Sequence, residues 1–74
     1  MISIELIFPV QQKRVCVRVN ETTHVGEFKR YLARFYKVKY DCILMLSNNK
    51  NVTDEMTLSE AGMFTGSGVV IDDG

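Results

Sequence analysis

The chain is poor in the residues that carry catalysis or bind metal. Its 74 residues include no tryptophan, two cysteines and one histidine. A structural zinc site takes about four nitrogen or sulphur ligands at short spacing. His24, Cys16 and Cys42 supply only three, and no residue is placed by the sequence as a base for either cysteine. Long apolar runs are also missing, because residues 43–46 and 69–71 fall far short of the ~20 residues that a membrane span requires.

The chain also lacks an excess of charge of either sign. Nine Lys or Arg balance nine Asp or Glu, and the isoelectric point is about 6.5. Nucleic-acid-binding domains typically show a basic face or an isoelectric point above roughly 9. We therefore expect neither a nucleic-acid nor a membrane partner, and no cofactor. Two cysteines do not make a disulfide framework, so we expect a reduced, intracellular setting, cytoplasmic and by diffusion nuclear.

What the chain does contain is enough apolar residues for one small core. Its length indicates a single domain over residues 1–74, with 72–74 as a flexible tail. Residues 2–8 alternate apolar and polar, and residues 14–19 do so again after a polar connection. Two adjacent alternating runs predict a β-hairpin. The one proline, Pro9, cannot donate to a sheet and so ends the first strand.

A helical period follows this hairpin. Apolar residues at i, i+3, i+7, i+10 and i+11 predict a helix with one apolar face. We expect a hydroxyl of Thr22 or Thr23 to cap its first turn, and Gly26 to permit close packing there. The predicted apolar face consists of Val25, Phe28, Leu32, Phe35 and Tyr36.

The remaining chain alternates strands and turns. Residues 43–46 predict a third strand, Val52 the start of a short one, and residues 69–71 the last. Between them, residues 57–62 are typical of one capped helical turn, with Thr57 as cap, Glu60 three residues on and Gly62 as terminator. One helix with a single apolar face has to pack across one mixed sheet, which predicts a two-layer α+β fold.

This order of elements resembles the ubiquitin-like family. The resemblance is densest over residues 22–29, 43–46 and 57–63, and the pattern runs from Val19 to Ile71. It implies a β-grasp fold, in which a mixed sheet of four to five strands packs on one helix in the order ββαβ(β)β. The first and third of these segments are also similar to elongin B. The chain departs from conjugated members of the family because it has no C-terminal Gly-Gly pair.

One face of such a sheet stays open, since a single helix covers only the other. Strand alternation predicts which side chains point outward, and the resemblance places the first and last strands side by side with the third next to the last. An apolar cluster with a charged border is typical of protein recognition. The predicted patch consists of Ile7, Leu44, Leu46 and Val70, bordered by Arg14, Arg18 and Cys16.

We therefore expect a non-enzymatic module that binds protein partners non-covalently and is monomeric when free. The resemblance implies partners in the ubiquitin system or in a larger complex. Leu46 matches the central Ile of the ubiquitin patch, whereas Asp72 stands where ubiquitin carries Val. A ubiquitin receptor should thus bind this chain poorly.

Two other functions stay open at this point. One is a covalent modifier, matured from a longer precursor or used as it stands, with Gly74 as the conjugation terminus. Lys50 matches a position at which ubiquitin chains are extended. The other is a small β-grasp subunit of a multi-component enzyme.

Overall fold

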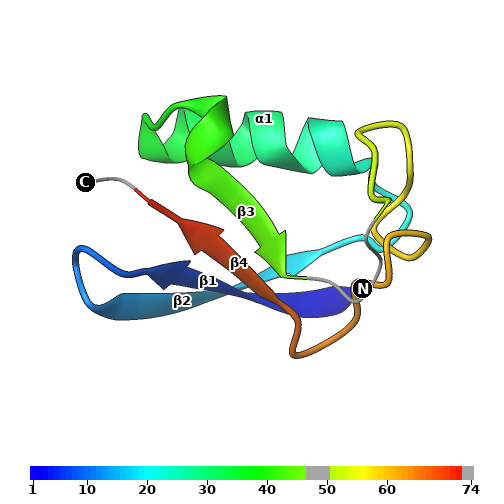
Figure 1. The fold of residues 1–74 in the computed structure, drawn as a ribbon. Helices are drawn as coiled ribbons and strands as arrows, with labels where there is room; N and C mark the ends of the chain where they lie inside the picture. Colours follow the sequence, from blue (N-terminus) through cyan, green and yellow to red (C-terminus); the bar gives the residue numbers. More distant parts are fainter. Residues whose placement is uncertain (47–50, 73–74) are drawn as a thin grey trace.

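The structure is a computed structural model that describes residues 1–46 and 51–72. A helix, α1 (Val25–Tyr36), lies across one face of a sheet (Figure 1). A short 3₁₀ turn, η1 (Tyr40–Cys42), leads from the helix back into the sheet. The strands are β1 (Ile2–Phe8), β2 (Lys13–Val19), β3 (Ile43–Leu46) and β4 (Gly68–Ile71).

The sheet is mixed, with the strand order β2-β1-β4-β3. The central pair, β1 and β4, is parallel, and each flanking strand is antiparallel to its neighbour. This confirms the predicted α+β fold of β-grasp type with four strands. The short strand expected at Val52 is wrong, because residues 51–56 form turns and irregular backbone in the described part of the chain.

The core lies between the inner face of the sheet and α1. Alternate residues of β1 are buried, as the period of the sequence predicted. On α1, however, the expected position of Phe35 is wrong, since its side chain is 63% exposed. Successive helical residues are turned by about 100°, and Tyr36 holds the inward position with its ring 4.9 Å from that of Phe8. Phe35 is therefore turned aside.

The start of α1 is stabilised from a distant loop. His24 is the N-cap and makes no side-chain cap bond, so the expected hydroxyl cap is wrong. The backbone N–H groups of Val25 and Gly26 instead donate to the carbonyl oxygens of Met56 (2.8 Å) and Asp54 (3.0 Å). These bonds satisfy two of the N–H groups that a helix start leaves without intrahelical partners.

The capped turn over residues 57–62 is confirmed. The Thr57 N–H donates to a Glu60 carboxylate oxygen at 3.0 Å, and the Glu60 N–H donates to the Thr57 hydroxyl at 3.1 Å. Gly62 ends the turn with φ at 82°, the left-handed region that favours glycine. Beyond β4, Asp72 was expected in a tail, but its N–H donates to the Cys42 carbonyl oxygen at 2.9 Å.

Candidate protein-binding face

The strand register brings the predicted patch residues together on the outer face of the sheet. Ile7 on β1 lies opposite Val70 on β4, and Val70 lies opposite Leu44 on β3. On the other side of Ile7, the register places Arg14 of β2. These four residues form one row that crosses the whole sheet.

The next outward row contains a glycine where the other rows carry side chains. Gly68 lies opposite both Glu5 and Leu46. A Cβ placed on Gly68 would meet the Cδ1 atoms of Ile7 and Leu46, each at 3.3 Å. The absence of a side chain at this position therefore lets Ile7 and Leu46 converge across β4.

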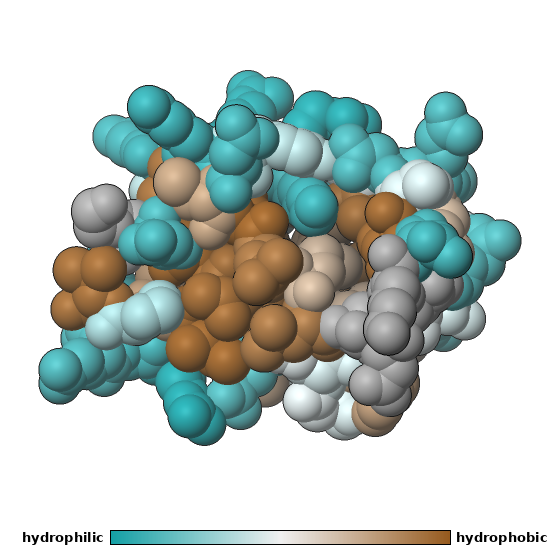
Figure 2. Space-filling view, in the orientation of Figure 1, coloured by the Kyte–Doolittle hydropathy of each residue, from teal (hydrophilic) through white to brown (hydrophobic). Residues whose placement is uncertain are grey.

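The four apolar residues differ in exposure. Leu44 is 61% and Leu46 46% exposed, whereas Ile7 and Val70 are half-buried in the middle of the sheet. Figure 2 shows apolar surface gathered over the region of β3 and β4, with hydrophilic side chains over α1. No helix or strand of the described residues covers this outer face. We call Ile7, Leu44, Leu46 and Val70 the sheet patch.

The charged residues expected at the border lie at different distances from the patch. Arg14 borders it directly, and its Nη1 donates to Glu5 Oε1 at 3.0 Å. Arg18 lies opposite Ser3, two rows further from Ile7. It also lines a groove of about 380 Å³ between β2 and α1. Cys16 is exposed between the two arginines, opposite Glu5.

The polar groups that could support chemistry have structural partners. His24 Nδ1 donates to the Glu55 carbonyl oxygen at 2.8 Å, which ties the helix start to the loop before Thr57. Burial and a hydrogen bond to Asp54 raise the pKa of Tyr40 to about 12. Among the described residues, no group of three or more His, Cys, Asp or Glu side chains could hold a metal ion. Nor does any helix of residues 1–46 and 51–72 have the length and apolarity to cross a membrane.

Two expected residues lie outside the described part of the chain, namely Lys50 and the candidate conjugation terminus Gly74. One surface was missed by the sequence reasoning. Tyr31 and Phe35 stack on the outside of α1 with ring centroids 5.8 Å apart. Their spacing of four residues on a helix was the available signal.

The fold places this chain among ubiquitin-like domains in architecture. No protein-family model and no curated protein matches the sequence. Solved structures do match. Ubiquitin from Caldiarchaeum subterraneum superposes with a TM-score of 0.73 at 18% identity, over 99% of this chain and 92% of that one.

Two further structures agree. The C-terminal ubiquitin-like domain of mouse tubulin-specific chaperone e gives a TM-score of 0.73 at 14% identity, covering 99% of this chain and 86% of that one. The ubiquitin-like domain of an Arabidopsis thaliana protein gives 0.72 at 21% identity, covering 95% and 73%. The chain therefore has a divergent ubiquitin-like β-grasp fold. The likeness is one of fold, and the similarity to elongin B stays a prediction.

Proposed function

We propose that the protein is a ubiquitin-like interaction module that binds another protein non-covalently through the sheet patch. The observation that carries this proposal is the register. It places Ile7, Val70 and Leu44 in one continuous row, with Leu46 converging on Ile7 over Gly68. Single exposed apolar residues are ordinary on any protein, whereas a contiguous group with a polar rim is typical of an interface.

The sheet patch combines accessible leucines with a polar rim. Leu44 and Leu46 lie on β3, an edge strand of the sheet. No other strand of the described residues lies beyond β3, so a partner can reach both leucines. The Arg14–Glu5 ion pair at the rim adds polarity and orientation more than affinity, because exposed pairs contribute about 0–1 kcal/mol. The affinity therefore has to come from burying the leucines.

The decisive variant is Leu46→Asp. Burying a leucine side chain contributes about 1.5–3 kcal/mol, and a charge at an apolar contact adds a desolvation cost. We expect partner affinity to fall at least tenfold, because 1.4 kcal/mol corresponds to a factor of ten. The fold should persist, since the Leu46 side chain is 46% exposed in the free protein.

The experiment captures partners on immobilised protein from an extract of the native source and then measures the affinity of each purified partner by calorimetry. Phe64→Asp is the matched control, because Phe64 is an exposed apolar residue (61%) outside the sheet patch. A partner that binds wild type and Phe64→Asp equally, but not Leu46→Asp, supports the proposal. Equal binding to all three proteins would refute it, as would loss of the fold in Leu46→Asp by circular dichroism.

A further inference from the structure

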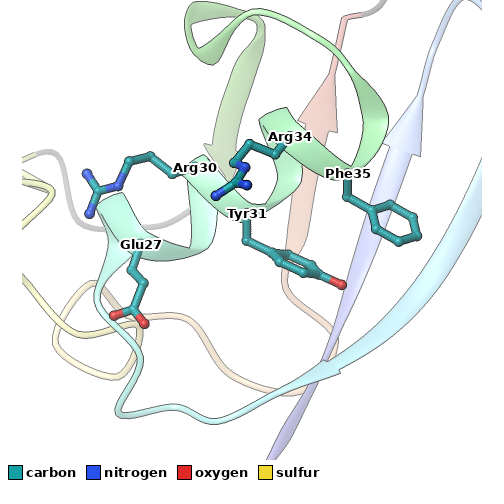
Figure 3. Close-up of a pocket in the computed structure, with 5 residues that line it drawn as sticks. All are labelled: Glu27, Arg30, Tyr31, Arg34 and Phe35. Carbon is teal, nitrogen blue, oxygen red and sulfur yellow. The ribbon is translucent and has the colours of Figure 1, made fainter.

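The outer side of α1 carries a second surface, distinct from the sheet patch. Its centre is the stacked pair Tyr31 and Phe35, which are 59% and 63% exposed. They line a shallow groove of about 630 Å³ together with Glu27, Arg30 and Arg34. In Figure 3 the two rings point to the same flank of α1, and the side chain of Arg34 runs back along the helix toward Tyr31.

Positive charge is concentrated in the stretch of sequence that carries this pair, although only Arg30 and Arg34 of its basic residues line the groove. Residues 29–39 contain five of the nine basic residues of the chain (Lys29, Arg30, Arg34, Lys37, Lys39) and no acidic one. The net charge of the whole chain is zero although residues 29–39 are basic. In the described part of the chain, the salt bridges join Glu5 to Arg14 and Glu21 to the N-terminus, so none of them neutralises this segment.

Helix stability explains the basic residue in the last turn of α1 but not the exposed aromatic rings. A basic residue in the last turn, here Arg34, interacts favourably with the negative end of the helix dipole. That effect does not account for two large aromatic rings left largely in water beside it. An exposed aromatic pair next to arginines is typical of binding sites, because these are the residue types that dominate interface energetics.

We propose that this groove binds an acidic segment of a partner protein that carries an aromatic or leucine side chain among its Asp and Glu residues. The apolar side chain packs against Tyr31 and Phe35. The flanking carboxylates pair with Arg34, whose guanidinium fork is well matched to them. The Arg30 side chain runs away from the two rings (Figure 3). Charge complementarity thus selects the occupant.

An acidic peptide fits the groove better than a nucleic acid does. Single-stranded nucleic acids require a basic groove that follows about 4–16 nucleotides. Here the basic segment is short, and acidic residues bound it on both sides, Glu27 before it and Asp41 after it.

The test uses the full chain and a fluorescein-labelled peptide of sequence Asp-Glu-Asp-Phe-Glu-Leu-Asp-Glu, with binding followed by fluorescence anisotropy. We expect saturable binding that weakens roughly tenfold in Arg34→Glu, since the variant loses an attractive pair and gains a repulsive one. The double change Tyr31→Ser with Phe35→Ser should weaken it by a similar factor. Arg14→Glu changes the net charge equally on the sheet face and should stay within twofold of wild type.

Three results would overturn the proposal. The first is equal weakening by Arg34→Glu and Arg14→Glu, which would indicate nonspecific attraction. The second is unchanged affinity when the Phe and Leu of the peptide are replaced by Ser, which would leave the aromatic pair without a role. The third is tighter binding of a twenty-nucleotide oligo(dT) than of the peptide. Leu46→Asp should leave peptide binding unaltered, so the outcome is independent of the sheet patch.

Discussion

Gly26→Ala tests how the start of α1 is packed. In an exposed helix, replacing Gly by Ala ordinarily stabilises by about 1 kcal/mol. Here an added Cβ would lie 2.7 Å from Asp54 Cβ and 3.1 Å from Asp54 Cγ. Carbon atoms pack best at about 3.5–4.0 Å, so the loop that carries Asp54 has to move by nearly 1 Å.

That displacement affects the bonds that start the helix. The Gly26 N–H donates to the Asp54 carbonyl oxygen, and the Val25 N–H donates to that of Met56 in the same loop. Overpacking costs about 1–3 kcal/mol, and each weakened hydrogen bond about 1 kcal/mol. After the gain in helix propensity, we expect a net destabilisation of about 1–3 kcal/mol. For a domain of this size, this lowers Tm by roughly 4–24 °C.

The assay is thermal and urea unfolding followed by circular dichroism at 222 nm, with two companion variants. Asp54→Gly removes the opposing Cβ and should make Gly26→Ala tolerable, whereas Asp54→Ala keeps that Cβ and should not. Both variants lose the hydrogen bond from Tyr40, so they form a matched pair. A Tm of Gly26→Ala at or above that of wild type would refute the reasoning, as would equal rescue by the two changes at residue 54.

Three further predictions follow from single contacts. The pKa of Tyr40 is raised to about 12 in the folded protein, so its contribution to stability is complete below pH 10 and is lost as the pH rises toward 12. The difference in free energy of unfolding between wild type and Tyr40→Phe should therefore shrink between pH 10 and pH 12. A constant difference would contradict the raised pKa. Hydrogen bonds from Thr57 lower the pKa of Glu60. In urea titrations, the free energy of unfolding of wild type should therefore exceed that of Glu60→Ala at neutral pH, and this difference should be lost as the pH falls through the lowered pKa. Thr57→Val should lower the free energy of unfolding by about 1 kcal/mol at neutral pH. Asp72→Val should strengthen binding to a ubiquitin-receptor domain in calorimetry, because it replaces an exposed carboxylate two residues after Val70 with the apolar side chain that ubiquitin carries there. Unchanged weak binding would show that other departures from ubiquitin dominate.

The sequence predicted the strands well because their signal is local. The alternation of apolar and polar residues in residues 2–6 predicts which side chains are inward, and burial in β1 follows it. Residues 43–46 are all apolar, so the sequence predicted Leu44 and Leu46 outward only on the condition that Ile43 and Met45 face the helix; in the structure Leu44 and Leu46 are exposed. The proximity of Leu44 and Leu46 to Ile7 could not be predicted from local sequence, because it depends on the strand order. That order came from the resemblance to a known fold.

The errors occurred where distant segments meet. The hydroxyl cap predicted for α1 is absent because carbonyl oxygens of residues 54 and 56 satisfy the first N–H groups, and no periodic pattern shows that these residues reach the helix. Phe35 and Tyr36 are adjacent aromatic residues, and only the position of the Phe8 ring decides which of them is inward. The role of Gly68 likewise needs the register, since its missing side chain matters only between Ile7 and Leu46.

The net charge of zero does not exclude a charged partner for one face of the molecule. A total of zero makes a polyanion an unsuitable partner for the whole chain, but a partner contacts one face and experiences the charge of that face. On the sheet, Arg14 is paired with Glu5, so the surface around the sheet patch is close to neutral and favours an apolar contact. On the outer side of α1, Arg30 and Arg34 line the proposed groove with one acidic residue, Glu27, so we propose that this surface favours carboxylates. The core separates these two surfaces, so the two proposed sites do not overlap.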